Sequence, residues 1–188
     1  MSRPLLLTDV DGVLLDWIRG FKEFYMDLGY VFTSPDPTNF PLTGWIEGVN
    51  DPAEIMNLLS GFNHSKEFSQ LKPTTGARQF ISAVAKDYDI IAITACSDRV
   101  AGARRANLEA VFGTVFNTIH CLNLGESKYK ILSKYKPSIW IEDNVSGADA
   151  GVLARHDAYL LDKEWNQGEL DPDIKRVPSL AYILKDIT

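Results

Sequence analysis

The chain has 188 residues, of which 45% are hydrophobic and 23% are charged, and its net charge is −6. This length and apolar content suffice for one domain with a full core and a small inserted lobe, and they exclude a disordered chain. The acidic balance argues against stable nucleic-acid binding, which needs clustered Lys and Arg, but it permits a small anionic substrate in a local positive pocket.

The first predicted element is a short buried strand that ends in two carboxylates. The apolar run Leu5–Leu7 leads to Asp9 and Asp11, and Gly12 follows directly. Such a run is typical of a buried parallel strand, and open α/β folds place their chemistry where the backbone leaves the sheet. Taken alone, the Asp-x-Asp-Gly stretch is equally compatible with an ordinary turn or hairpin.

A helix with an aromatic face is predicted next, with Asp16 as its cap and Gly29 at its end. Residues 30–50 are predicted to be irregular, because Pro and Gly residues interrupt any long period. The buried face of the helix is expected to carry Trp17, Phe21, Phe24, Tyr25 and Leu28, which recur at helical spacing.

A second helix is expected to begin at Pro52, because Asp51 precedes it as a cap and proline suits the first helical position. This helix is predicted to run to about Leu59 and to end at Gly61. Residues 15–72 are therefore predicted to form a small, mostly helical insertion rich in aromatic residues.

From residue 73 onward, strands and helices are predicted to alternate, which indicates a parallel α/β sheet with right-handed crossovers. We interpret Arg99, Arg104 and Arg105 as a solvated helix face, with Arg99 also near enough to a strand end to contact substrate. The predicted strands cover residues 89–94, 115–121 and 158–161, with a further strand in the apolar run 137–144 that ends in adjacent acids. The predicted helices cover 77–86, 98–112, 128–134, 147–155 and 179–187, with Asp98 as a cap.

Three buried strands end in polar groups: Asp9 and Asp11, then Thr94, then Glu142 and Asp143. In a parallel sheet these ends lie on one edge, so the groups can converge although they are far apart in sequence. Converging carboxylates repel each other unless a hard cation lies between them, and Mg²⁺ prefers such oxygen ligands. We therefore predict a Mg²⁺ site at Asp9 and Asp143. The alternative is that Glu142 and Asp143 only cap the following helix.

The ordered set of strand ends resembles the four motifs of the haloacid dehalogenase superfamily. The residues that carry this resemblance are Asp9-Val10-Asp11-Gly12-Val13, Thr94, a lysine near 128, and Glu142-Asp143-Asn144. The resemblance implies a Rossmann-like core made of residues 1–14 and 73–188, with a helical cap made of residues 15–72. Lys72-Pro73-Thr74-Thr75-Gly76 resembles the segment by which the chain of these proteins re-enters the core domain after the cap.

The resemblance also implies catalytic and metal-binding roles. Asp9 would be the nucleophile that becomes an aspartyl phosphate, and Asp11 would protonate the leaving oxygen and later activate water. Asp9, the backbone carbonyl of Asp11 and Asp143 would hold Mg²⁺. Glu142 is a further metal ligand by analogy with the branch that carries a Glu-Asp pair, and whether it binds the ion directly is open.

Phosphate binding is implied for the end of the second strand and for a lysine. Thr94 and the backbone N–H of Ala95 would hydrogen-bond the transferred phosphoryl group, and Lys128 would offset charge on both Asp9 and phosphate. Lys130 lies close by in the sequence and is the alternative to Lys128.

Asp11 determines the reaction class that the resemblance implies, because the dehalogenases of this superfamily lack the second Asp. A phosphatase is therefore favoured, with a phosphomutase as the alternative. The start of the chain also resembles the 5′(3′)-deoxyribonucleotidases, in which cap aromatics stack on the base. A nucleoside monophosphate is thus the first expected substrate and a sugar phosphate or other small monoester the second. Residues expected to contact it are Trp17, Phe21, Phe40, Trp45 and Phe62.

A domain of another class, one that binds a phosphorylated ligand without catalysis, is also compatible with the sequence. His64, His120 and His156 show no ligand spacing and are not expected to act in catalysis. Cys96 and Cys121 form no Cys-x-x-Cys pair, which predicts a reduced cytoplasmic protein, although a single disulfide stays open. No apolar run is long enough to span a bilayer, so no membrane association is expected.

Overall fold

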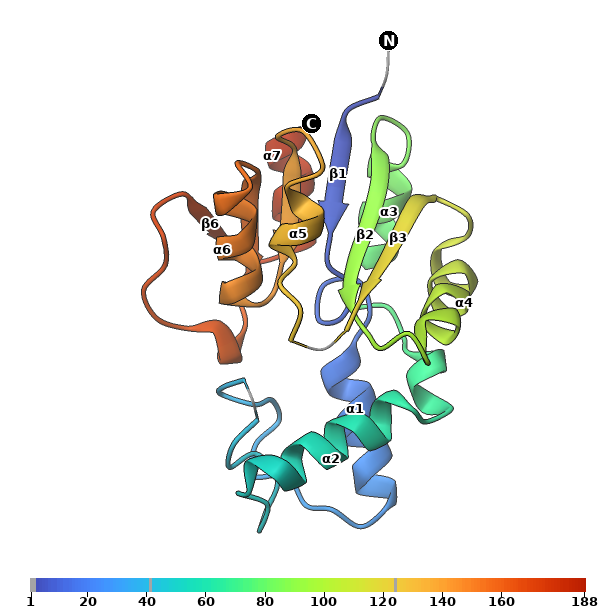
Figure 1. Ribbon diagram of the computed structural model, residues 1–188, viewed down its shortest axis with the longest axis vertical. Coiled ribbons are helices and arrows are strands. Elements are labelled where there is room, and N and C mark those ends of the chain that lie inside the picture. Colours follow the sequence, from blue (N-terminus) through green and yellow to red (C-terminus); the bar gives the residue numbers. More distant parts are fainter. Residues whose placement is uncertain (1–2, 41, 124) are drawn as a thin grey trace.

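A six-stranded sheet in the order β3-β2-β1-β4-β5-β6 forms the centre of the molecule (Figure 1). The computed structural model describes residues 3–40, 42–123 and 125–188. All neighbouring strands are parallel, which confirms the predicted α/β class. The strands are β1 (Leu5–Thr8), β2 (Asp89–Ala95), β3 (Phe116–Leu122), β4 (Ile139–Glu142), β5 (Asp157–Leu161) and β6 (Ile174–Val177).

β1 lies at the middle of the sheet, where the strand order reverses. Its Thr8 is aligned with Ala92 of β2 on one side and with Ile141 of β4 on the other. The Asp9 N–H donates to the Ile141 carbonyl at 2.8 Å and so extends the ladder by one residue. The crevice beyond the ends of β1 and β4 is the place where open α/β sheets bind ligands.

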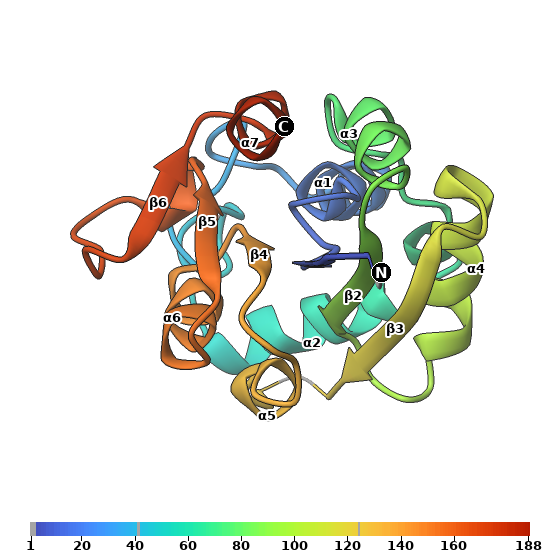
Figure 2. The same cartoon turned by 90° about the horizontal axis from the view of Figure 1, so that it is seen from above.

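Helices cover both faces of the sheet (Figure 2). α3 (Ala77–Val84) and α7 (Leu180–Ile187) pack with Leu6 on one face, and α5 (Tyr129–Leu132) and α6 (Val145–Leu153) pack with Leu7 on the other. Successive residues of β1 thus point to opposite faces, as the pleat requires. α4 (Ala101–Phe112) lies beside β3 at the edge of the sheet (Figure 2).

The segment between β1 and α3 forms a helical lobe at the carboxyl ends of the strands (Figure 1). It contains α1 (Trp17–Asp27), α2 (Pro52–Asn63) and the short 3₁₀ helix η1 (Glu67–Gln70). The chain enters and leaves the lobe at one place, because Asp16 N–H donates to the Lys72 carbonyl at 2.8 Å and Thr74 N–H donates to the Leu14 carbonyl at 2.9 Å.

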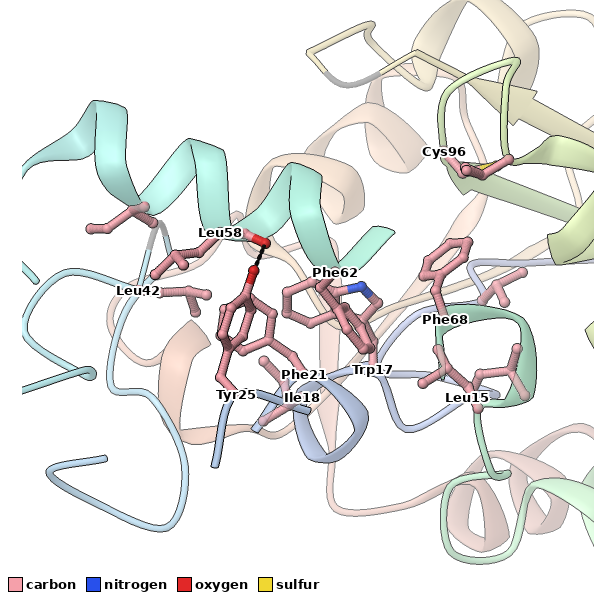
Figure 3. Close-up of a cluster of buried hydrophobic side chains, with 14 of the residues drawn as sticks. Leu15, Trp17, Ile18, Phe21, Tyr25, Leu42, Leu58, Phe62, Phe68 and Cys96 are labelled. Atoms are coloured by element: carbon pink, nitrogen blue, oxygen red, sulfur yellow. Dashed lines mark hydrogen bonds between the residues drawn. The ribbon is translucent and has the colours of Figure 1, made fainter. Parts of the chain in front are cut away.

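An aromatic core holds the lobe together (Figure 3). Phe21 is fully buried, and its ring lies 4.9 Å from Trp17, 5.9 Å from Trp45 and 5.6 Å from Phe62, measured between ring centroids. Stacked and edge-to-face rings of this kind add to the stability that the core gains from burial. Most of the predicted apolar face of α1 is therefore core, although Leu28 is exposed.

The end predicted for the second helix is wrong. α2 continues through Gly61 to Asn63. A Cβ at Gly61 would lie 2.9 Å from the Tyr25 hydroxyl oxygen, and that hydroxyl donates to the Leu58 carbonyl at 2.6 Å (Figure 3). Gly61 thus lets a tyrosine approach the helix closely and does not end it.

Two other expectations of local structure are also wrong. β6 was not predicted, because two of its four residues, Lys175 and Arg176, are cationic and it lies at the edge of the sheet. Asp98 does not cap α4, which begins after Val100 without a side-chain cap. By contrast, Asp16 and Asp51 cap α1 and α2 as predicted.

Pro41 belongs to the segment that was predicted to be irregular, and it lies outside the described residues. Both cysteines are free thiols. Within residues 3–40, 42–123 and 125–188, none of the helices has the length and apolar content needed to cross a membrane.

Candidate active site

The carboxylates that end β1 and β4 are brought together by a glycine turn. Gly12 has φ +79°, a backbone conformation that residues with a side chain rarely adopt. A Cβ at Gly12 would lie only 2.0 Å from Asp143 Oδ2. The carboxylate of Asp143 therefore occupies the space that any other residue at position 12 would fill.

Asp9, Glu142 and Asp143 form a buried acidic cluster. Each offers a carboxylate oxygen, and these oxygens lie within 4.8 Å of one another. The residues are 5%, 1% and 8% exposed. A Cβ at Gly147 would lie 1.9 Å from Glu142 Oε1, so α6 leaves room for the cluster beside its first turn.

Lys128 bridges two members of this cluster. Its Nζ lies 2.7 Å from Asp9 Oδ1 and 2.5 Å from Glu142 Oε1, and the side chain is only 13% exposed. Lys130, the alternative left open by the sequence, is exposed on α5. The structure therefore places Lys128 at the site.

Glu142 has hydrogen bonds at both oxygens. Oε1 accepts from Lys128, and Oε2 accepts the N–H groups of Asp143 and Asn144 at 2.8 and 3.2 Å. Glu142 thus orients both Lys128 and the turn that carries Asp143, and Oε1 keeps a second lone pair with which it could also reach an ion.

The charges of the cluster do not balance. The pKa of Asp9 is raised to about 7, through burial first and then through the Glu142 carboxylate, although Lys128 opposes both effects. The pKa of Asp143 also lies well above its ordinary value, through burial and then the charges of Glu142 and Asp9. Although burial disfavours the charged lysine, Asp9 and Glu142 raise the pKa of Lys128. One ammonium faces three carboxylates, a donor set that fits a divalent, oxygen-preferring cation such as Mg²⁺.

Asp11 is paired with an arginine that was expected to be solvated. Arg104 Nη2 lies 2.7 Å from Asp11 Oδ1, and the Arg104 side chain is fully buried. The prediction for Arg104 is wrong because this part of α4 turns inward, where Asn107 and Leu108 are also buried. Arg99 and Arg105 are exposed, in agreement with the predicted solvated face.

Thr94 and Ala95 end β2 beside these groups. The Thr94 side chain is fully buried, and its hydroxyl has no hydrogen-bond partner among the described atoms. Ala95 lies on the wall of the cavity that contains Asp9 and Asp11. A buried hydroxyl without a hydrogen-bond partner destabilises the fold unless it can donate to an oxygen of a bound ligand.

A cavity of about 750 Å³ extends from the acidic cluster to the helical lobe. Of the predicted substrate contacts, Trp17 and Phe40 line it, whereas Phe21, Trp45 and Phe62 lie in the aromatic core of the lobe. These three rings pack on one another, since Phe21 of α1 contacts Trp45 of the irregular segment and Phe62 of α2, and they are therefore buried in the lobe. The remaining lobe residues that line the cavity are Ile18, Met56, Leu59 and Asn63.

Trp165 was missed by the sequence analysis. It belongs to the 3₁₀ helix η2 (Glu164–Asn166), lines the cavity and has an indole N–H without a partner in the described part of the chain. The neighbouring Asn166 donates to the Asp143 carbonyl at 2.8 Å and so ties this loop to the acidic cluster. The available signal was the position of Trp165 just after β5, at the edge where the other strand ends meet.

Comparisons with known proteins place this arrangement among known folds. No protein-family model matches the sequence. An uncharacterized 32.4 kDa protein from the gp30–rIII intergenic region of Enterobacteria phage T4 is 24% identical over 196 residues, covering 98% of this chain and 68% of the phage protein.

Several solved structures share the fold. CbbY from Rhodobacter sphaeroides, in complex with phosphate, matches with a TM-score of 0.62, 17% identity and coverage of 97% of this chain and 96% of its own. The HAD-hydrolase YfnB from Bacillus subtilis, bound to magnesium, matches with a TM-score of 0.65, 16% identity and full coverage of both chains. The L-2-haloacid dehalogenase from Xanthobacter autotrophicus, with chloropropionic acid covalently bound, matches with a TM-score of 0.61, 10% identity and coverage of 99% and 98%. The chain thus has the fold of the haloacid dehalogenase-like hydrolases, as the sequence motifs predict.

Proposed function

We propose that the protein is a Mg²⁺-dependent phosphomonoester hydrolase that forms an aspartyl phosphate on Asp9. The observation that carries this proposal is the contact between Asp9 and Lys128, whose Nζ lies 2.7 Å from Asp9 Oδ1. Asp11, two residues further on, supplies a second carboxyl group. Phosphoryl transfer from a monoester needs one group that attacks phosphorus and another that handles the proton of the leaving oxygen.

Asp9 and Asp143 would hold the Mg²⁺ ion, together with the backbone carbonyl of Asp11. The imbalance of charge in the acidic cluster supports this assignment, because burial leaves Asp9 and Asp143 with raised pKa values in the absence of a cation. When bound, the ion supplies positive charge that keeps Asp9 ionised and offsets the charge of an incoming phosphate dianion. Glu142 would act mainly by holding Lys128.

In the first step a carboxylate oxygen of Asp9 attacks phosphorus, and the bond from phosphorus to the leaving oxygen breaks. The carboxyl group of Asp11 donates a proton to that oxygen. In the second step Asp11 takes a proton from water, the water oxygen attacks phosphorus, and Asp9 and inorganic phosphate are released. Thr94, the Ala95 N–H and Lys128 would bind the phosphoryl oxygens throughout.

The first candidate substrate class is the nucleoside monophosphates. Trp17 and Phe40 give the lobe side of the cavity an aromatic wall, and Asn63 and Trp165 add polar groups near it. Flat bases stack well on such rings, whereas a bare sugar phosphate gains less from them. A sugar phosphatase or a phosphomutase is the alternative within the same chemistry.

Two other functions have specific support. Dehalogenation is supported by the shared fold of the Xanthobacter enzyme, but the carboxyl group of Asp11 at the cavity favours phosphoryl transfer. Binding of a phosphorylated ligand without turnover is supported by the size of the apolar cavity wall. Release of chloride from 2-chloropropionate would favour dehalogenation. Thermal stabilisation by a phosphorylated ligand that is not turned over would favour binding without catalysis.

The deciding experiment measures phosphate release from p-nitrophenyl phosphate and from a panel of nucleoside and sugar monophosphates, with Mg²⁺ and with EDTA. We expect turnover only with Mg²⁺, and loss of turnover in Asp9→Asn. Asp149→Asn is the matched control, because Asp149 is an exposed carboxylate on α6. Absence of turnover on the whole panel would overturn the proposal.

A further inference from the structure

Arg104 is a fully buried cation whose charge is directed at Asp11. Its Nη2 lies 2.7 Å from Asp11 Oδ1 and 3.1 Å from Asp11 Oδ2. Among the described residues, Asp11 is the only carboxylate that forms an ion pair with Arg104. Asp11 itself is not sealed off, since its side chain is 23% exposed and lies on the cavity wall.

The other side of the guanidinium faces the segment that returns from the helical lobe. The Arg104 Cζ atom lies 4.0 Å from the centre of the Phe68 ring, and Phe68 belongs to η1. One turn along α4, the Asn107 amide donates to the Leu71 carbonyl at 3.1 Å. The buried arginine is thus held between an aromatic ring of the lobe and the carboxyl group at the end of β1 (Figure 3 shows the position of Phe68).

A fully buried guanidinium is costly to place in a core, and replacing such a pair by apolar residues is often neutral or stabilising. Stability alone therefore gives little reason for an arginine here. Its planar fork, stacked on a ring, fixes direction better than a flexible lysine ammonium does.

We propose that Arg104 is a positioning residue that orients the Asp11 carboxyl group toward the leaving-group oxygen, and that Phe68 keeps Arg104 in place. This inference rests on the proposed phosphatase function and deepens it. Arg104 itself contacts no substrate. It acts through Asp11, so its loss weakens proton transfer to the leaving oxygen and leaves the attack by Asp9 in place.

The leaving group makes this role measurable. An alkyl phosphate releases a basic alkoxide oxygen, which needs the proton from Asp11 when the bond from phosphorus to oxygen breaks. p-Nitrophenyl phosphate releases a stabilised phenolate, which needs little help from an acid. Since kcat/KM reports steps up to the first irreversible one, it isolates transfer to Asp9 from the later hydrolysis of the aspartyl phosphate.

The experiment compares kcat/KM for an alkyl phosphate and p-nitrophenyl phosphate in wild type, Arg104→Met, Arg104→Lys and Asp11→Asn. We expect Arg104→Met to lose about 10-fold or more in the ratio of alkyl to nitrophenyl activity, since general acid catalysis contributes about 10²–10⁴-fold. Arg104→Lys should lose less, because it keeps the charge. Phe68→Leu should shift the ratio in the same direction as Arg104→Met.

The double variant Arg104→Met, Asp11→Asn completes a double-mutant cycle. If Arg104 acts through Asp11, its substitution should not change the ratio further once Asp11 is replaced. Arg105→Met is the matched control, because Arg105 is the exposed neighbour on α4, and it should keep the wild-type ratio. Melting temperatures identify variants that fail to fold, and for those the comparison uses Arg104→Lys.

An equal loss on both substrates in Arg104→Met and Arg104→Lys would overturn the positioning role and leave a purely structural one. A further change of the ratio in the Asp11→Asn background would overturn the claim that Arg104 acts through Asp11. Failure of the proposed function is distinct, because the wild-type protein would then turn over neither substrate.

Discussion

Lys128 Nζ lies 2.7 Å from Asp9 Oδ1, so the ammonium at the start of α5 contacts the carboxylate at the end of β1. Lys128→Met removes this charge and the bond to Glu142. We expect kcat with p-nitrophenyl phosphate to fall by about 10²–10³-fold, the effect of removing one preorganised charge or donor. Lys130→Met should stay close to wild type, because Lys130 is exposed. Equal losses in both variants would contradict the role given to Lys128.

The stability of the metal-free protein should fall as pH rises toward neutrality. Asp9 has a pKa of about 7 in the folded protein against an ordinary value of 3.8, so the folded state retains a proton that the unfolded chain releases. The contribution of Asp9 to stability is therefore fully present below about pH 4 and is lost as pH rises through 7. Melting temperatures in EDTA across this range test the trend.

Added Mg²⁺ should reverse this trend, since a bound cation replaces the proton. The gain in melting temperature on adding Mg²⁺ should be larger at pH 8 than at pH 5. Asp143→Asn removes one of the repelling carboxylates, so it should raise the melting temperature in EDTA and reduce the gain with Mg²⁺. A gain that does not depend on pH or on Asp143 would speak against a metal site in this cluster.

Gly12→Ala should disrupt the site more than it disrupts the fold. The new Cβ would meet Asp143 Oδ2 at 2.0 Å and must displace that carboxylate. The matched control is Gly29→Ala, since Gly29 also has a positive φ but has open space around it. Both variants should lose about 1–2 kcal/mol of stability from backbone strain. Only Gly12→Ala should also lose activity and Mg²⁺-induced stabilisation; normal activity in that variant would show that the position of Asp143 is unimportant.

Phe40→Ala should raise KM for nucleoside monophosphates with a small effect on kcat. Phe40 is 46% exposed and lines the cavity, so its ring can stack on a base but does not touch the reacting atoms. KM for an alkyl phosphate should change little, because that substrate lacks a flat ring. Tyr182→Ala, which removes an exposed aromatic ring from α7, is the control. An equal rise in KM for both substrates would remove the preference for nucleotides.

The sequence predicted the meeting of Asp9 and Asp143, because each directly follows a buried strand and parallel strands end at one edge of a sheet. Lys128 was expected only through the resemblance to the haloacid dehalogenase superfamily, with Lys130 as the alternative, because it precedes a short helix and not a strand end. The inward position of Arg104 was not predictable in the same way, because α4 has no clear apolar face and the ion pair depends on where Asp11 comes to lie.

Trp165 and Gly61 show a similar limit. Trp165 lies in a 3₁₀ helix of only three residues, which is too short for a periodic pattern to indicate which way a side chain faces. Gly61 looks like the end of a helix in sequence, and only the approach of the Tyr25 hydroxyl explains it. Contacts between segments that are distant in the chain leave no local signal, whereas strand ends and helix caps do.

The measurement that tests the central claim most directly is mass analysis of the acid-quenched protein during turnover. With p-nitrophenyl phosphate, Mg²⁺ and the Asp11→Asn variant, hydrolysis of the intermediate should slow and one phosphoryl group should accumulate on the peptide that contains Asp9. Hydroxylamine should remove it, as expected for an acyl phosphate. Turnover without any phosphoryl group on Asp9, or turnover retained in Asp9→Asn, would contradict the account.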